Sequence, residues 1–420
     1  MIDFARTFRA LRHRNFRLFF TGQGLSLTGT WLQQVAMGWL AYRLSGSALL
    51  LGVIAFCGNI GILMFGTLAG VLADRVRKRR ALYITQSLML TQAVTLAVIT
   101  ATGIVQIEHL IALALWLGIV SAFDVPLRQA SYVHFVDDRA DLANAIALNS
   151  LMVNAARVVG PALAGLMLAV VSEAVCFALN ALSFVAVMIA FARMHWHEEP
   201  RAPAPGGWLA HWAEGARYAL GFPPTRTLLA LVAVLAWTIS PYVSLMPVYA
   251  KDVFGGGPHT LGFLLAAAGA GALASTAFLA SRRSVAGLGR VIAAAAATAG
   301  VALAAFAYLT VLPLALALMV AVGGGLILAA ASSNTILQTL VDDRLRGRVA
   351  GFYVMAFLGI APLGQLAAGA LAKAIGVQPT FFANGIIAFA AAMWFARKLP
   401  AMRALVRPIY VQRGIALDDS

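Results

Sequence analysis

The sequence predicts an all-α membrane protein with twelve transmembrane helices, arranged as two six-helix bundles related by pseudo-two-fold symmetry. Composition, the spacing of apolar segments and an internal repeat all point to this fold class. Of the 420 residues, 61% are hydrophobic and 11% are charged, whereas soluble domains carry about 25% charged residues. The net charge of +15 comes from short basic clusters between apolar segments, a distribution that argues against a nucleic-acid-binding domain.

The apolar segments are long enough to cross a bilayer, which takes about 20 helical residues. In chain order the expected spans are residues 16–42, 47–73, 81–103, 109–130, 143–170, 173–193, 227–250, 260–281, 288–309, 312–338, 348–371 and 378–397. A Pro-rich linker and an amphipathic helix on the membrane surface are expected between the sixth and seventh spans. The expected domains are an N-terminal bundle, a cytoplasmic linker with this interfacial helix, and a C-terminal bundle with a cytoplasmic tail, over residues 1–193, 194–226 and 227–420.

An internal repeat relates the two bundles. The tetrapeptide VDDR occurs at residues 136–139 and again at 341–344, 205 residues later. Each copy follows a polar stretch and precedes a span that contains a proline, Pro161 in the first case and Pro362 in the second. Parallel repeats with a binding site between them near the membrane midplane are typical of secondary transporters.

The basic residues predict the orientation of the chain. If the N-terminus is cytoplasmic, all but four of the 31 Lys and Arg residues lie at the cytoplasmic side, as the positive-inside rule requires. The exceptions are Arg43, Lys251, Lys373 and, within a span, Arg157. The N-terminal segment is basic and runs directly into the first span without a cleavage site of small residues, so it is interpreted as cytoplasmic. Both termini are therefore expected in the cytoplasm.

A motif follows the second span. The stretch GVLADRVRKRR at residues 70–80 resembles the loop 2–3 signature of the major facilitator superfamily, although Arg77 stands where Gly is usual. Its motif residues are Gly70, Asp74, Arg75, Lys78 and Arg79. The stretches LRHRNFRLFF, WLQQVAMGWLAYRLSGSALLLG, SAFDVPLRQA and EGARYAL are similar to the drug:proton antiporter branch that contains the enterobactin and macrolide exporters. The resemblance implies the major facilitator fold, a bacterial inner membrane and a proton gradient as the energy source, with no cofactor.

Asp74 is expected to act in an inner gate. The eleventh span begins near Arg348, and the positive end of its dipole attracts a carboxylate. Asp74 is expected to cap that end or to pair with Arg346 or Arg348 when the two halves close inside. The alternative is that Asp74 only balances the neighbouring cations. Gly70 is expected to let two helices approach closely.

Asp124 is the only acid well inside an expected span. Arg128 follows one helical turn later, so the two side chains are expected to pair, with Pro126 between them. Ionisable residues at membrane depth usually mark function. The resemblance implies a gating charge relay through Asp74, Lys78 and Asp124; proton carriage by Asp124 is the alternative.

The fifth span contains NAARVVGPALAG, which partly resembles the antiporter motif of the superfamily and makes Gly160 and Pro161 expected helix-kink positions, together with Pro362. In the superfamily, spans 1, 4, 7 and 10 line the substrate cavity. The cavity candidates on these spans and their neighbours are Trp31, Gln34, Asn59, Asn154, Arg157, Trp237, Asn334 and Gln365, with Gln33, Trp116 and Tyr242 as further polar or aromatic positions.

Arg157 lies about 22 Å into the fifth span, at 1.5 Å per residue. A cation at this depth is costly, so Arg157 is expected to contact either substrate or backbone carbonyls near Pro161. Substrate contact would favour an acidic or electron-rich cargo, because a guanidinium binds such oxygens in a bidentate manner.

These features predict an exporter of a small amphipathic molecule, either a siderophore or a drug-like compound, working by proton antiport with alternating access. A lipid-handling or sensory protein on the same scaffold is the alternative. The expected partners are the small-molecule substrate and the lipid bilayer, not nucleic acid, and the protein is expected to be a monomer. No nucleotide-binding loop or catalytic motif is found, so no enzyme activity is predicted. The HWHEE stretch at residues 195–199 has no further histidine or cysteine framework, so no metal site is predicted.

Overall fold

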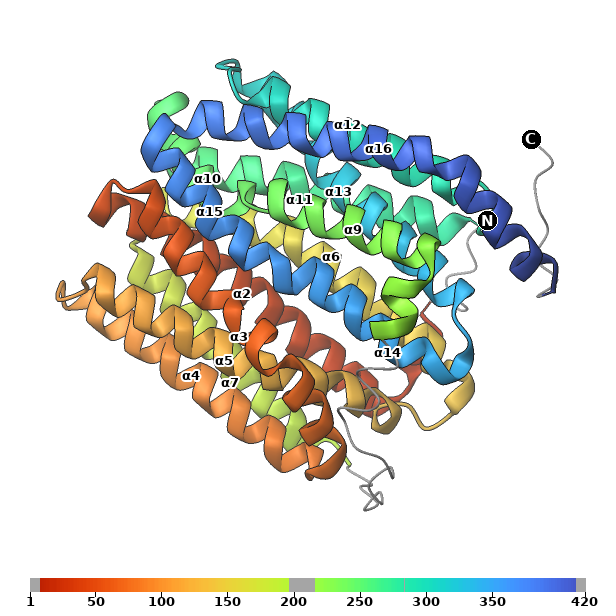
Figure 1. Ribbon diagram of the computed structural model, residues 1–420. Helices are drawn as coiled ribbons and strands as arrows, with labels where there is room; N and C mark the ends of the chain where they lie inside the picture. Colours follow the sequence, from red (N-terminus) through yellow and green to blue (C-terminus); the bar gives the residue numbers. More distant parts are fainter. Residues whose placement is uncertain (1–7, 196–215, 283, 413–420) are drawn as a thin grey trace. The chain divides into compact units, whose positions relative to one another are not determined.

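The computed structural model describes residues 8–195, 216–282 and 284–412, and this part of the chain contains helices and no strands (Figure 1). Eleven helices in this part are long and apolar enough to cross a membrane. The first expected span is also a helix, α2 (Arg14–Ser45), but it is not among the eleven; buried polar side chains such as Gln23, Ser26 and Gln33 make it less apolar. The predicted all-α membrane fold is confirmed.

The chain divides into two compact units. The first unit comprises Met1–Pro203 with Ala250–Ala266, and the second comprises Ala204–Tyr249 with Ala267–Ser420. The helices of residues 8–195 are α2, α3 (Ala48–Arg75), α4 (Lys78–Ala101), α5 (Ile107–Ser131), α6 (Leu142–Met167) and α7 (Glu173–Arg193). Short 3₁₀ segments are η1 (Arg9–Arg12), η2 (Tyr132–His134) and η3 (Arg139–Asp141). The division into domains at residues 193 and 226 stays a prediction, and most of the linker lies outside the described residues.

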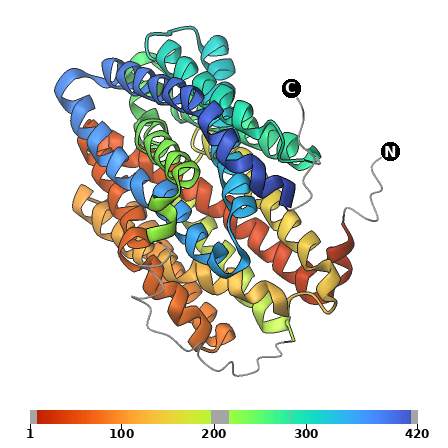
Figure 2. The ribbon, with the colours of Figure 1, turned by 45° about the vertical axis from the view of Figure 1, so that its right-hand side comes forward.

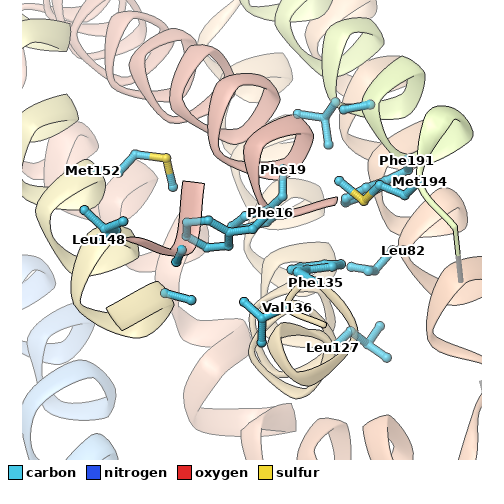
Figure 3. Close-up of a cluster of buried hydrophobic side chains, with 14 of the residues drawn as sticks. Phe16, Phe19, Leu82, Leu127, Phe135, Val136, Leu148, Met152, Phe191 and Met194 are labelled. Carbon is cyan, nitrogen blue, oxygen red and sulfur yellow. The ribbon is translucent and has the colours of Figure 1, made fainter. Parts of the chain in front are cut away.

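An aromatic cluster closes one end of the first unit (Figure 3). Phe16, Phe19 and Phe135 are fully buried, and the rings of Phe19 and Phe135 stack with their centroids 4.7 Å apart. Burial of each such side chain contributes about 1.5–3 kcal/mol. The cluster therefore fixes the start of α2 against the loop between α5 and α6.

The later part of the chain consists of α9 (Pro223–Thr238), α10 (Tyr242–Val248), η4 (Tyr249–Val253), α11 (Pro258–Ser281), α12 (Leu288–Phe306), α13 (Leu312–Leu340), α14 (Asp343–Val354), η5 (Met355–Gly359), α15 (Ile360–Ile375) and α16 (Val377–Gln412). The seventh expected span is broken between α9 and α10, where Pro241 precedes α10. The eleventh contains the π-helical segment η5 shortly before Pro362. Because proline lacks an N–H group, it displaces the hydrogen-bond pattern of the preceding turn.

The last helix is longer than the sequence predicts. The expected twelfth span ends at residue 397, whereas α16 continues to Gln412 through Pro400 and Pro408 (Figure 2). At 1.5 Å per residue, its 36 residues measure about 54 Å. This length exceeds the roughly 30 Å core of a bilayer. Because α16 continues beyond residue 397, the first part of the expected cytoplasmic tail is helical.

Two glycine crossings show the repeat in the structure. In the first unit, a Cβ atom added to Gly61 of α3 would clash with the backbone at Gly118 of α5. In the second unit, Cβ atoms added to Gly271 of α11 and Gly323 of α13 would clash with the backbone of the facing helix. Gly61 and Gly271 are each residue 14 of their helix, and Gly118 and Gly323 are each residue 12. The same helix pairs therefore approach through glycine at the same positions.

Candidate functional site

The gating motif forms the connection between α3 and α4. Arg75 ends α3, Lys78 begins α4, and Arg77 precedes α4 in an extended conformation. The side chain of Asp74 lies outside the described part of the structure, so its pairing with Arg346 or Arg348 stays a prediction. Within the first unit, no neighbouring atom lies within 4 Å of a Cβ added to Gly70, and its expected role in a close helix approach stays a prediction. Helix α3 makes its close approach at Gly61 instead.

Asp124 lies in a buried polar cluster between α4 and α5. Its side chain is 1% exposed. Thr85 Oγ1 and Gln86 Nε2 donate hydrogen bonds to Asp124 Oδ1 over 2.7 and 2.8 Å. Arg128 Nη2 lies 3.4 Å from Asp124 Oδ2, which confirms the expected pair, and α5 remains helical through Pro126. These donors stabilise a carboxylate that would otherwise be costly to bury.

Sequence reasoning missed Thr85 and Gln86. The signal was present, because the dipeptide Thr-Gln occurs twice inside the apolar helix α4, at residues 85–86 and 91–92. A polar pair in an apolar span requires partners, since an unpaired polar group buried away from water costs free energy. The first pair contacts Asp124, and Gln92 of the second pair has an amide partner on α2.

Gln33 is that partner, and its side chain is buried within the first unit. Its amide nitrogen donates to Gln92 Oε1 over 3.0 Å, and its oxygen accepts a 2.8 Å hydrogen bond from Asn180 Nδ2. All three side chains are buried in the interior of the bundle. They connect α2, α4 and α7 and satisfy one another, as buried polar groups usually do.

Trp31 and Arg157 are brought together. The guanidinium carbon of Arg157 lies 5.7 Å from the centroid of the Trp31 ring, within cation–π range. Gly160, one turn further along α6, permits this contact because a Cβ atom there would clash with the Cβ atom of Trp31. Helix α6 continues through Pro161 to Met167. The partners expected for Arg157 were substrate and the backbone carbonyls near Pro161. An aromatic ring from α2 was not among them.

The remaining candidates of the first unit are dispersed. Gln34 is exposed on α2. Asn59 and Asn154 each donate to the carbonyl one turn earlier in their own helix, over 2.9 and 2.8 Å. Trp116 is exposed and donates to the carbonyl oxygen of Leu88 over 3.2 Å. Only Trp31 and Arg157 among these candidates contact each other in the described residues.

In the second unit, Trp237 and Gln365 lie where α9 meets α15. A Cβ atom added to Gly364 would clash with the backbone of Trp237, so the two helices touch at this point. Gln365 is 9% exposed, and its Oε1 atom has no hydrogen-bond partner among the described residues. Tyr242 is buried at the start of α10. A buried amide oxygen without a protein partner fits a position next to water or a solute.

Asn334 lines a hollow of about 460 Å³ in the second unit. The hollow lies where α13 ends and α14 begins. Its lining residues are Asn334, Thr335, Gln338, Thr339 and Arg346. Each of these lining residues, among those that the structure describes, is polar, and Arg346 is a cation.

A charge cluster at the start of α6 was missed at the sequence level. Asp141 is buried and contacts three cationic side chains from the segment before α2: Arg9, Arg12 at 2.7 Å and His13 at 2.8 Å. The other ring nitrogen of His13 lies 3.0 Å from Asp137 Oδ2. Burial lowers the pKa of His13, but hydrogen bonds to Asp141 and Asp137, together with their charges, raise the pKa above its usual value. The cluster attaches the N-terminal segment to the loop between α5 and α6.

Comparison with known proteins identifies the family. A model of a family described as transmembrane secretion effector matches residues 5–409. The Staphyloferrin A transporter of Staphylococcus aureus is 25% identical over 380 residues, covering 90% of this chain and 95% of its own. The multidrug efflux pump Tap of Mycolicibacterium fortuitum is 29% identical over 364 residues, covering 84% of this chain and 88% of its own.

Solved structures share the fold. A bacterial homologue of the human lysosomal transporter Spinster has a TM-score of 0.72 at 14% identity, over 94% of this chain and 98% of its own. The nucleoside transporter NupG has a TM-score of 0.70 at 16% identity, over 93% and 98%. The family match covers nearly the whole sequence, and the helices follow the expected order of spans. The chain therefore belongs to the transmembrane secretion effector family of major facilitator transporters.

Proposed function

We propose that this protein exports a small amphipathic molecule from the cytoplasm of a bacterium, across the inner membrane, by proton antiport with alternating access. The siderophore and multidrug names of its relatives support a solute of this size and character. The observation that carries the proposal is the buried carboxylate of Asp124, which accepts two hydrogen bonds and lies 3.4 Å from Arg128. A charge this deeply buried in an apolar bundle is expensive, and such charges mark ion or proton pathways.

Within this proposal the other charged residues have separate roles. Asp74, Arg75, Lys78 and Arg79 form the inner gate, in which Asp74 pairs with the start of the eleventh span. Arg157 and Trp31 contact the substrate, because they present a cation and an aromatic ring in one place on α2 and α6. Asp124 connects proton movement to the gate through Thr85 and Gln86 of α4, the helix that Lys78 begins.

The test is transport by purified protein in proteoliposomes with an imposed pH gradient. An Asp124→Asn variant should lose gradient-driven export. If Asp124 carries the proton, this variant should still exchange substrate across the membrane; if it acts in a gating relay, exchange should be lost as well. Intact gradient-driven export in Asp124→Asn would exclude both roles.

A matched control is available in Glu173. This carboxylate is also largely buried in the first unit and pairs with Arg43 over 3.0 Å, but it lies at the start of α7, away from the gating motif. Glu173→Gln should therefore retain gradient-driven export. Equal loss in Glu173→Gln and Asp124→Asn would indicate a general effect of removing a buried acid.

A further inference from the structure

We infer that the end of α16 is a binding surface for the headgroups of anionic phospholipids. The surface consists of four cations on this one helix, Arg397, Lys398, Arg403 and Arg407. All four side chains are exposed. The inference goes beyond the proposed export function, because it concerns a partner of the protein in the membrane and not its cargo.

The first cations of this surface lie at one edge of the membrane core. Helix α16 begins at Val377 and contains no charged residue before Arg397, which is about 30 Å along the helix axis, the thickness of the core. About one turn earlier, Trp394 is 41% exposed, and tryptophan is enriched at membrane interfaces. A neighbouring span begins at the same level, because a Cβ atom added to Gly289, the second residue of α12, would lie 2.8 Å from Leu399 Cδ2. The helix beyond residue 397 therefore lies outside the core.

The part of α16 beyond the core, dark blue in Figure 2, has two different faces. One face is buried at every fourth position, by the side chains of Met402, Val406 and Tyr410. Arg403 and Arg407 lie on the exposed face, together with Leu405, which is 46% exposed. Exposed cations and apolar side chains on one helix face are typical of helices at the membrane–water interface. The last turn of α16 contains no basic residue, so the helix dipole does not explain these cations.

The geometry of an α-helix turns these cations back towards the bilayer. Every Cα–Cβ bond tilts towards the N-terminus of its helix, and α16 begins at the far side of the core. At 1.5 Å per residue, Arg403 lies about 9 Å and Arg407 about 15 Å beyond Arg397 along the helix axis. The headgroup layer is roughly 5–8 Å deep. The long side chain of Arg403 therefore reaches this layer, whereas Arg407 lies near its outer limit, and any tilt of the helix brings both closer.

The charges of the whole sequence leave negative partners to be supplied from outside the chain. The second unit contains 14 Lys and Arg residues and five Asp and Glu residues, and the first unit contains 17 and 11, so neither unit has a surplus of acids. From residue 397 to the end of the chain there are five cations and only two acids, Asp418 and Asp419. Pairing with these two acids leaves at least three of the cations unbalanced. Four to eight cations directly after a membrane helix are the arrangement that attracts anionic headgroups.

The experiment is native mass spectrometry of the purified full chain with added phosphatidylglycerol or phosphatidylcholine, which gives an apparent dissociation constant for each lipid. We expect phosphatidylglycerol to bind more tightly than phosphatidylcholine. A variant that combines Arg397→Gln with Lys398→Gln should weaken phosphatidylglycerol binding about tenfold or more, because one cation near an anionic surface changes the affinity roughly fivefold. Arg403→Gln should have a smaller effect and Arg407→Gln the smallest, in the order of their distance from the core.

Two controls separate this surface from positive charge in general. A variant that combines Arg397→Lys with Lys398→Arg keeps both charges and should bind phosphatidylglycerol as the unmodified protein does. Lys373→Gln removes an exposed cation of the same unit from the last turn of α15, just before α16 begins and so at the opposite edge of the core. It should leave the preference for phosphatidylglycerol unchanged. The melting temperature of each variant, measured alongside, identifies any that fails to fold.

Equal binding of the two lipids by the unmodified protein would overturn the inference, as would unchanged phosphatidylglycerol binding in the double glutamine variant. A preference for phosphatidylglycerol that appears only after Asp418→Asn and Asp419→Asn would also overturn it, because the tail acids would then occupy the surface. Displacement of phosphatidylglycerol by an equal concentration of inorganic phosphate would assign the cations to a soluble anion instead. None of these measurements involves transport, so their failure is distinct from failure of the exporter proposal.

Discussion

In the first repeat, ten residues separate α5 from α6, and the buried Asp141 at the end of this loop is surrounded by cationic side chains of the N-terminal segment. In the second repeat, only two residues separate α13 from α14, and Arg346, at the equivalent position, lines a hollow. The helices that lead into these two junctions cross their neighbours in the same manner, through Gly118 and Gly323. The repeat therefore preserves the backbone crossing and reverses the charge of the junction.

The difference separates two kinds of constraint. A glycine crossing depends on backbone contact, so neither repeat has room for an added carbon atom at this position. A junction at the end of a membrane helix depends on charge balance, and different segments of the chain supply that balance. A junction whose charge is balanced by its own chain anchors a segment, as the cluster around Asp141 does.

The largest expected effect tests the glycine crossing that the two repeats share. Gly118→Val and Gly323→Val should each prevent stable folding, because overpacking alone costs about 1–3 kcal/mol and here the new side chain meets backbone that has no room to shift. Thermal unfolding and yield from the membrane measure this effect. Gly70→Val, at a position without close neighbours in its unit, should fold normally. If one of the two crossings tolerates valine, the repeats are not equivalent at these helices.

The next largest effect tests the charge of the junction, which differs between the two repeats. Asp141→Arg gives the first repeat the charge of the second and places a buried cation against Arg9, Arg12 and His13. We expect a large fall in melting temperature and rapid proteolysis of the N-terminal segment. Asp138→Arg, three positions earlier in the same loop and exposed, should have little effect. Similar stability of the two variants would show that the cationic cluster does not anchor the segment.

Much of the fold was predictable, because long apolar segments, the position of basic residues and the VDDR repeat each depend on sequence alone. The Asp124–Arg128 pair was also predictable, since helical spacing determines which side chains meet. The partners that were missed, Thr85 and Gln86 for Asp124 and His13 for Asp141, come from other helices or segments. Their identity depends on tertiary packing, and the spacing of residues along one helix does not show how different helices pack together. The crossing at Gly61 was missed for a related reason: a small residue permits close approach but does not require it, so the sequence does not show which glycine of α3 makes the crossing.

A smaller effect concerns the contact between Trp31 and Arg157. Trp31→Leu keeps an apolar side chain in place and removes the ring that faces the guanidinium, a contact worth about 0.5–2 kcal/mol. If the pair contacts cargo, the variant should bind an aromatic or anionic substrate several-fold more weakly with an unchanged melting temperature. Trp116→Leu, at an exposed position on α5, is the matched control. A lower melting temperature with unchanged binding would instead assign the pair to stability.

The smallest effect is the pH dependence of the junction in the first repeat. His13 faces Asp137 and Asp141 from the loop before α6, and Arg9 and Arg12 share the same carboxylate from η1. Burial opposes the charged form, but the two carboxylates outweigh it and raise the pKa of His13 above its usual value of 6.5. Protonated His13 therefore stabilises the folded state fully below pH 6.5, and this stabilisation is lost as the pH rises through the elevated pKa. The pKa of Asp141 is lowered, first by the hydrogen bond from His13, so its own contribution is lost only in acid, below its usual value of 3.8.

Comparison of His13→Gln with the unmodified protein isolates this contribution. The melting temperature of the variant should be lower by about 2 °C near pH 6, the size expected for one partly screened charge interaction. The difference should shrink steadily towards pH 9, because neutral histidine no longer attracts the two carboxylates. Arg12→Gln, which removes a cation that does not titrate in this range and contacts the same oxygen of Asp141, should give a difference that does not change with pH. A His13→Gln difference that stays constant or grows with pH would show that the imidazole is held neutral, and that the arginines alone balance Asp141.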